Sequence, residues 1–300
     1  MSTIFPASIA SAYFKMLSPE QTVERYLEAG FTHAELCHEH LSDLICRADE
    51  TGKTPYAVGV ELRSFIDDKG FFIPQGHLSF RPGAQGGILT EGLLDRIKRE
   101  LELFHGLGVK NAVLHLSAYS ELSDEERHQK VLPVLAELSD FVKGTDICLC
   151  IENLYKNADV FTVEQIFRYM DEVSADNLGI CLDTGHLHLV NALGLAKQSQ
   201  REFILKAGDK LKALHIDNND GVRDQHLLPF NNNHSIHWDE VVQALVDAGY
   251  RGIFNLEIGG EHSSVTCPFR VRLMKLSYIR NLMDYMLSEE FLAWEGNENK

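Results

Sequence analysis

The chain has 300 residues, 44% of them hydrophobic, a length at which α/β barrels form a single domain with one large core. Its formal net charge of -16, from 28 basic and 44 acidic side chains, makes a nucleic-acid partner unlikely by composition, because phosphate backbones are bound by basic faces. The sequence lacks an apolar run near the ~18 residues of a membrane span, a secretory pattern and CxxC pairs, so we expect a cytoplasmic protein with reduced thiols.

Short apolar runs alternate with longer amphipathic runs along the chain. In chain order, the predicted strands and the helices that follow them are 3–9 and 19–29, 31–36 and 56–68, 71–79 and 93–107, 110–116 and 124–142, 147–152 and 162–173, 178–183 and 195–207, 211–216 and 239–248, and 253–258 and 270–286. This alternation predicts a single (β/α)₈ TIM barrel over residues 1–287, followed by a polar tail at 288–300. A doubly wound sheet is the alternative, but no Gly-rich phosphate turn follows the first strand.

Histidine or carboxylate side chains lie at or beside the ends of six successive predicted strands, from the third to the eighth. They are His77, His115, Glu152, Asp183, His215 and Glu257. In a barrel these strand ends surround one mouth, and histidine with carboxylate suits zinc and related divalent ions. A single polar residue at a strand end is more often a hydrogen-bonded structural group, whereas a run over consecutive strands favours a metal site. The carboxylate that closes the apolar run ICLCIE also needs a strong partner, and a cation supplies one.

Two further motifs follow these strands. Asp183 begins the motif DTGH, which ends on His186, and the loop after the seventh strand contains the DQH of Asp224 and His226. With its ligand-type residues in this order, the chain resembles the xylose isomerase-like TIM-barrel superfamily, which includes sugar-phosphate isomerases and epimerases and the three-zinc apurinic/apyrimidinic endonucleases. The resemblance implies a central metal site of Glu152, Asp183, His215 and Glu257, a second on His77, His115 and Glu152, and a third on His186, Asp224 and His226.

The segment LLPFNNNHSIHWDE resembles the isomerase and epimerase branch, in which a flexible turn separates a His-Leu-x-Pro run from a Trp-Asp pair. Asparagines at 231–233 replace the usual Gly-rich turn, and Asn adopts positive φ more readily than most residues. One departure concerns the ketose 3-epimerases, which carry an arginine shortly after the metal-binding histidine. Arg223 is only an approximate candidate for that position, which leaves the substrate open.

We therefore predict an enzyme of carbohydrate metabolism, a divalent-metal-dependent isomerase or epimerase of a sugar, sugar phosphate or polyol. The resemblance implies one to three ions of Zn, Mn, Mg or Co. Proton transfer at a carbon next to a carbonyl needs a cation that stabilises the enediolate and two carboxylates that exchange the proton. Glu152 and Glu257 are the candidates for this pair, and His186 would orient a substrate oxygen. Phe80 and Tyr119, just beyond two of the histidines, are candidates for an apolar wall against the substrate.

Two alternatives stay open. In a zinc-dependent endonuclease-like phosphodiesterase, the same cluster would generate a hydroxide that attacks a phosphodiester. In a non-catalytic barrel, the cluster would bind metal or sugar without turnover, and the fold alone does not exclude this. His38 and His40, after the second strand, are expected to be surface histidines. We expect a small-molecule partner and no membrane, and a homo-oligomer is left open.

Overall fold

The computed structural model describes residues 3–231, 236–259 and 267–293. Its eight strands form one parallel sheet in the order β7-β6-β5-β4-β3-β2-β1-β8. The strands are β1 (Ala7–Ala10), β2 (His33–Leu36), β3 (Phe72–His77), β4 (Asn111–Leu114), β5 (Cys148–Glu152), β6 (Leu178–Asp183), β7 (Leu211–His215) and β8 (Phe254–Leu256). Beyond the end of β7, the amide of Ile216 donates to the Asn255 carbonyl at 2.9 Å and its carbonyl accepts from the Glu257 amide at 3.1 Å, which joins the two edges. The predicted TIM barrel is confirmed.

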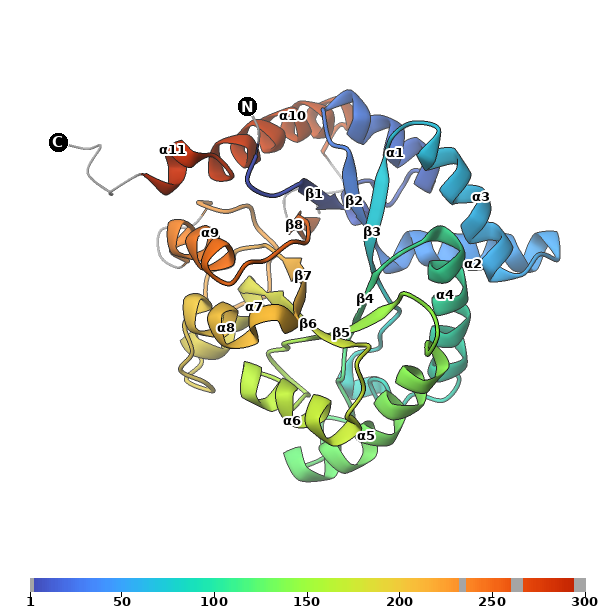
Figure 1. Cartoon of the computed structure of the whole chain (residues 1–300), viewed down its shortest axis with the longest axis vertical. Helices are drawn as coiled ribbons and strands as arrows, with labels where there is room; N and C mark the ends of the chain where they lie inside the picture. The colour runs from blue at the N-terminus through green and yellow to red at the C-terminus, as the bar shows by residue number, and fades with distance from the viewer. Residues whose placement is uncertain (1–2, 232–235, 260–266, 294–300) are drawn as a thin grey trace.

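Helices surround this ring of strands (Figure 1). They are α1 (Pro19–Glu28), α2 (His38–Thr51), α3 (Pro55–Asp67), α4 (Leu93–Leu107), α5 (Asp124–Phe141), α6 (Val163–Val173), α7 (Thr184–Ala192), α8 (Gln200–Ala207), α9 (Trp238–Asp247), α10 (Phe269–Met286) and α11 (Glu289–Leu292), with short 3₁₀ turns η1 (Ser11–Phe14), η2 (Gly83–Gln85) and η3 (Gly208–Lys210). Capping boxes begin α1, α5 and α8, with Ser18, Ser123 and Ser199 as the capping residues. No helix within the described residues is both long and apolar enough to cross a membrane.

Two helices follow strands more closely than the sequence predicted. α2 begins at His38, directly after β2, whereas the prediction placed only the helix 56–68 after that strand. α7 begins at Thr184 and is buried on most sides, so it lacks the amphipathic period that marks a surface helix. The expectation that His40 lies at the surface was wrong. α2 turns this side chain inward, where it is fully buried and its Nε2 lies 3.0 Å from the Leu17 carbonyl oxygen.

The segment after 287 is not simply a polar tail. It continues as α11, whose Phe291 is only 2% exposed and packs with its ring centre 5.5 Å from that of Tyr285 and 6.0 Å from that of Phe230. Phe291, with the partly buried Leu292, anchors this segment against α10 and the loop before α9. Residues 294–300, the rest of the predicted tail, lie outside the described residues.

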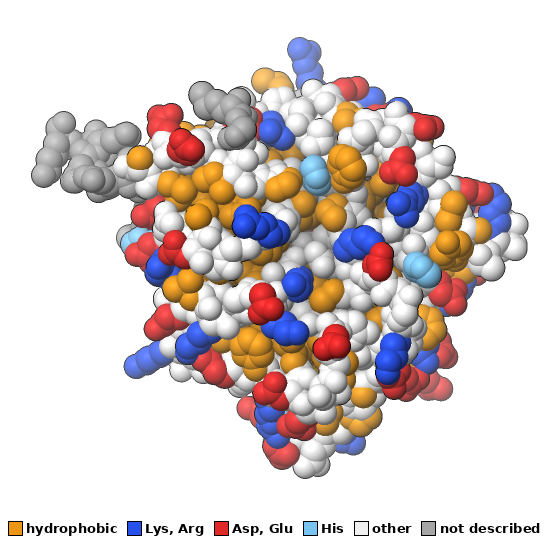
Figure 2. Space-filling model, in the orientation of Figure 1, with side chains coloured by type: hydrophobic (Ala, Val, Ile, Leu, Met, Phe, Trp, Pro, Cys, Tyr) orange, Lys and Arg blue, Asp and Glu red, His pale blue; other side chains and the backbone are white. Residues whose placement is uncertain are grey.

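The hydrophobic core fills the space between the strands and the helices. Charged side chains of both signs are interspersed over the face seen in Figure 2. The closest helix packing joins α3 to α4 through two glycines. A Cβ on Gly59 would lie 2.2 Å from the Leu103 carbonyl oxygen, and one on Gly106 would lie 2.1 Å from the Tyr56 carbonyl oxygen. Both helix backbones approach so closely that no side chain fits between them.

This contact predicts the effect of Gly59→Ala. Alanine gains about 1 kcal/mol of helix propensity over glycine, but the added methyl group must displace backbone, so we expect a net loss of about 1–3 kcal/mol in the free energy of unfolding. Urea denaturation measures it. Ser64→Ala, at an exposed position of the same helix, is the matched control and should leave stability unchanged or slightly raised. Equal stability of Gly59→Ala and wild type would contradict the close packing.

Candidate active site

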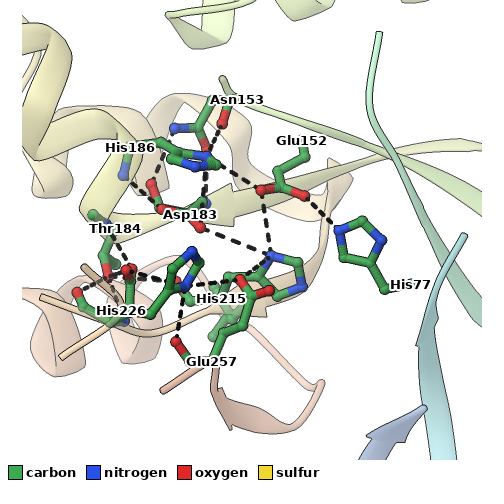
Figure 3. Close-up of polar contacts among 12 residues, drawn as sticks. His77, Glu152, Asn153, Asp183, Thr184, His186, His215, His226 and Glu257 are labelled. Atoms are coloured by element: carbon green, nitrogen blue, oxygen red, sulfur yellow. Dashed lines mark hydrogen bonds and ion pairs between the residues drawn. The ribbon is translucent and has the colours of Figure 1, made fainter. Parts of the chain in front are cut away.

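Four ligand-type side chains converge at the carboxyl ends of neighbouring strands (Figure 3). Glu152 ends β5, Asp183 ends β6, His215 ends β7 and Glu257 follows β8, and one ligand atom of each lies within 4.8 Å of the others. His215 Nδ1 is 3.1 Å from Glu257 Oε2, 3.4 Å from Glu152 Oε1 and 3.9 Å from Asp183 Oδ2. The barrel thus brings together, from four strands, the residues predicted to form the central site.

Two atoms of this group are buried without a hydrogen-bond partner among the described residues. They are Asp183 Oδ2 and His215 Nδ1. The other Asp183 oxygen is satisfied, because Oδ1 accepts from the His186 amide at 2.6 Å. Buried polar atoms are normally paired, and an unpaired one costs free energy. The two unpaired atoms face the same point as the two glutamates, so the donor set and its geometry fit a divalent cation.

Neighbouring charges set the protonation of the carboxylates. Burial raises the pKa of Asp183 to about 6. Burial also acts to raise the pKa of Glu152, but the neighbouring imidazoles of His115 and His215 outweigh it and hold that pKa well below its usual value. Glu257 behaves in the same way, since His215 and His226 overcome the effect of burial and lower its pKa. Glu152 and Glu257 are therefore ionised at neutral pH and can accept a proton.

A buried carboxylate below this group fixes the ring of His215. The His215 Nε2 donates to Glu35 Oε1 at 2.9 Å, because a carboxylate can only accept. Glu35 also accepts from Gln75 Nε2 at 3.0 Å and from Asn255 Nδ2 at 2.8 Å. This arrangement directs Nδ1 toward the cluster. The sequence analysis did not name Glu35 as a site residue. It is a carboxylate near the end of the second predicted strand, and Glu152 was predicted as a ligand from the same kind of position in ICLCIE.

A second group shares Glu152 with the first. His77 Nε2 and His115 Nε2 lie 3.2 Å apart, and Glu152 Oε2 is 2.9 Å from His115 Nε2 and 3.4 Å from His77 Nε2. The Nδ1 of His77 donates to the Leu78 carbonyl at 2.8 Å, which directs Nε2 into the group. The Phe80 ring packs over both imidazoles, with ring centres 4.6 Å from His115 and 5.4 Å from His77. Phe80 therefore forms an apolar side of the site, at the position where the sequence predicted an apolar wall.

A third group lies where the loop after β7 meets α7. Asp217, Asp224 and His226 offer ligand atoms within 4.8 Å of one another, and His186 Nε2 lies 3.4 Å from Asp224 Oδ2. His186 Nδ1 lies 2.9 Å from the Asn153 carbonyl oxygen and donates to it. The sequence analysis had named all of these ligands except Asp217, which is fully buried.

Asp217 is held by the turn of the DTGH motif. Its Oδ1 accepts from the Gly185 amide at 2.9 Å, and its Oδ2 is buried with no hydrogen-bond partner in the described part of the chain. Burial raises the pKa of Asp217 well above its usual value. The missed signal was its spacing, because a residue two positions after His215 on an extended segment points to the same side.

A cavity of about 270 Å³ opens onto all three groups, a size at the lower end of ligand sites and suited to a small molecule. Phe80 and His186 line it, whereas two predicted substrate contacts do not. Tyr119 is 38% exposed outside the cavity lining, and the Arg223 side chain is 71% exposed and pairs with Asp220 at 3.1 Å. The conformation of the loops determines which side chains line the cavity, and no periodic pattern in the sequence predicts that conformation.

A second cavity, of about 640 Å³, lies against the same cluster and shares His77, Phe80, His226 and Glu257 with the first. His38 lines it, with its ring centre 4.9 Å from that of Phe80. The His38 side chain is 38% exposed, so it lies at the surface while it also lines this cavity, and partial burial lowers its pKa to about 4.

Two curated proteins are similar to parts of this chain. An uncharacterized protein of Sinorhizobium fredii is 27% identical over 170 residues, covering 55% of this chain and 52% of that protein. A D-psicose 3-epimerase of Enterocloster bolteae is 25% identical over 213 residues, covering 66% of this chain and 65% of that protein. Both matches span less than two thirds of the relative's own length.

The fold is shared with solved structures as well. D-psicose 3-epimerase with D-tagatose from Clostridium cellulolyticum superposes with a TM-score of 0.72 at 17% identity, over 94% of this chain and 99% of that chain. A family model described as xylose isomerase-like TIM barrel matches residues 23–275. Since that match includes all the strand-end ligands described above, the chain belongs to the xylose isomerase-like TIM-barrel family.

Proposed function

We propose that this chain is a divalent-metal-dependent isomerase or epimerase of a sugar or polyol, acting by proton transfer at a carbon next to a carbonyl. The observation that carries the proposal is the convergence of two ionised carboxylates, Glu152 and Glu257, on Asp183 Oδ2 and His215 Nδ1 beside a small cavity. These last two atoms have no hydrogen-bond partner within the described residues. The similarity to a D-psicose 3-epimerase supports the reaction class.

Glu152, Asp183, His215 and Glu257 would hold the central ion. A bound divalent cation would polarise the substrate oxygens and stabilise the negative charge that develops on them. The additional groups around His77 with His115, and around Asp217 with Asp224 and His226, have the donors for up to two further ions. Their mixed nitrogen and oxygen donors suit Zn, Mn or Co, and the oxygen-rich groups also suit Mg.

The proton transfer would be carried by the two glutamates. Glu152 and Glu257 come from strands β5 and β8 on different sides of His215, so they can address the substrate carbon from two directions. One takes the proton from the carbon and the other returns it, which inverts the centre or moves the carbonyl. His186, whose Nδ1 donates to a backbone carbonyl, would use Nε2 to orient a substrate oxygen.

A second candidate function is a zinc-dependent phosphodiesterase of the abasic-site endonuclease type. The specific observation in its favour is that the two outer groups supplement the central one, so the mouth has donors for three ions. Such a site would activate water against a phosphodiester, and no carboxylate would act as a carbon base. The net charge of -16 weighs against a polyanionic partner.

The first prediction concerns metal content. Protein purified without chelators should carry at least one divalent ion per chain, measured by elemental analysis. Removal of the ion should lower the melting temperature, because the buried atoms of Asp183 and His215 lose their partner, and re-addition should restore it. A chain that neither contains nor takes up a divalent ion would refute the site.

The second prediction concerns the glutamates. Glu152→Gln and Glu257→Gln should each abolish exchange of the substrate C–H proton with deuterated solvent, followed by NMR on ketoses and inososes, because each variant removes a proton carrier. His226→Ala should lose less activity, since the central group remains complete. Asp159→Asn, a buried carboxylate that accepts from Tyr169 and does not line the cavity, is the control and should keep full exchange. Cleavage of abasic DNA that falls steeply with salt, without proton exchange on any sugar, would select the second candidate.

The third prediction concerns Glu35. Glu35→Gln removes the charged acceptor behind His215, and we expect a loss of about 10–100-fold in affinity for the central ion, measured by competition with a metal indicator. Asp159→Asn again serves as a control for a buried carboxylate lost elsewhere, and it should lower stability without changing metal affinity. Unchanged affinity in Glu35→Gln would mean that the network only packs the barrel.

A further inference from the structure

We propose that the substrate carries an anionic group, a phosphate ester or a carboxylate, which binds between Arg81 and Lys156 on the wall of the first cavity. The inference rests on the proposed function and narrows its substrate class. Both side chains line the cavity that opens onto the ligand cluster, Arg81 from the loop after β3 and Lys156 from the loop after β5.

Unlike most basic side chains in the described part of the chain, these two cations have no carboxylate partner. Within residues 3–231, 236–259 and 267–293, neither forms an ion pair, and the nearest acceptor of Arg81 is the carbonyl of Phe80 at 3.5 Å. In the whole chain acidic residues outnumber basic ones, 44 to 28, and many cations are paired, as Arg223 is with Asp220. Unpaired cations beside a cavity, in a chain this acidic, are available for an anionic ligand.

Packing between the two loops holds both cations on one wall. Gly83, two residues after Arg81, lies so close to Asn157 that a Cβ on the glycine would be 2.3 Å from the Asn157 Cβ. The Ala118 amide donates to the Asn157 carbonyl at 3.0 Å, and the Ser117 hydroxyl donates to the Arg81 carbonyl at 3.3 Å. The backbones that carry the two cations are therefore tied to the same strand extension after β4.

One aromatic ring separates each cation from the ligand cluster. The Lys156 ammonium lies 4.7 Å from the centre of the Tyr155 ring, whose centre is 4.9 Å from that of His186. On the other side Phe80, the residue before Arg81, packs on the imidazole of His115. The cavity thus has carboxylates and imidazoles at its floor and cations at its wall. A sugar whose carbonyl end meets the floor would present an anionic group at its far end to the wall.

The second cavity is less suited to an anion. It is lined by Lys15 and Arg272, but Lys15 is paired with Glu39 at 3.3 Å. Three carboxylates, those of Glu35, Glu39 and Glu257, also line it. The first cavity is also lined by three carboxylates, those of Glu152, Asp224 and Glu257, so the two cavities differ in their cations. Both cations of the first cavity lack an ion pair among the described residues, whereas Glu39 already neutralises Lys15 in the second, which makes the wall of Arg81 and Lys156 the better anion site.

Binding measured by calorimetry on the metal-loaded protein tests the inference without requiring turnover. The probes are three ligands of matched carbon skeleton, a free ketopentose, its 5-phosphate and the corresponding terminal carboxylate. We expect at least one anionic form to bind the wild type about ten-fold or more tightly than the free sugar, and this preference to disappear in the double variant Arg81→Gln/Lys156→Gln. The phosphate and carboxylate arms distinguish the two sources of the anion.

Matched variants separate a local site from overall charge. Lys130→Gln/Arg251→Gln removes two exposed cations that line neither cavity and should keep the preference. Arg272→Gln tests the second cavity, and loss of the preference there alone would overturn the assignment. Equal binding of free and anionic sugars would also overturn it, while proton exchange on neutral ketoses would leave the proposed function standing. Tight binding and cleavage of abasic DNA, lost in the Arg81/Lys156 double variant, would instead assign the two cations to a nucleic-acid phosphate.

Discussion

The structure depends on how charge is buried at the mouth of the barrel. Asp183 and His215 are fully buried and each keeps one polar atom without a hydrogen-bond partner among the described residues. Burial on this scale is unfavourable for an isolated group, so the arrangement is stable only if something of opposite charge is shared among the converging side chains. In the protein alone, raised pKa values of the imidazoles supply part of that charge, as at His215, where the surrounding acidic groups outweigh the effect of burial. A divalent cation would supply it directly.

The support for this cluster reaches into the barrel itself. Ser8 donates to Asn255, Asn255 and Gln75 donate to Glu35, and Glu35 accepts from His215, so strands β1, β8, β3, β2 and β7 share one buried polar network. Each strand presents its polar side chain to the interior because residues alternate across a strand. The network fixes the ring of His215 through the same strands that close the barrel. Fold and site are therefore coupled, since any shift of register would break the network.

The distribution of charge around the mouth also has a functional meaning. Carboxylates and imidazoles of the cluster line the cavity, and Arg81 and Lys156, which form no ion pair in the part of the chain that the structure describes, line it from loops. Phe80 and Tyr155 separate the two zones with apolar rings, and both pack against imidazoles of the cluster. Because the two sides of the cavity carry different charges, it can bind a small polar molecule in one orientation, which carboxylates alone could not enforce. The reaction proposed for the floor and the specificity proposed for the wall are thus separate properties of one site.

The sequence by itself determined the barrel and most of its ligand set. Alternating apolar and amphipathic runs predicted the eight strands, and residues such as His77 and Glu152 at strand ends had to converge because parallel strands in a barrel share one mouth. Asp217 and Glu35 carried the same local signals but were not among the predicted ligands. Only the tertiary structure decided which loop side chains enter the cavity. Arg81 and Lys156 line it while Tyr119 and Arg223 do not, since loop direction is set by contacts such as that of Gly83 with Asn157, which leave no periodic trace in the sequence.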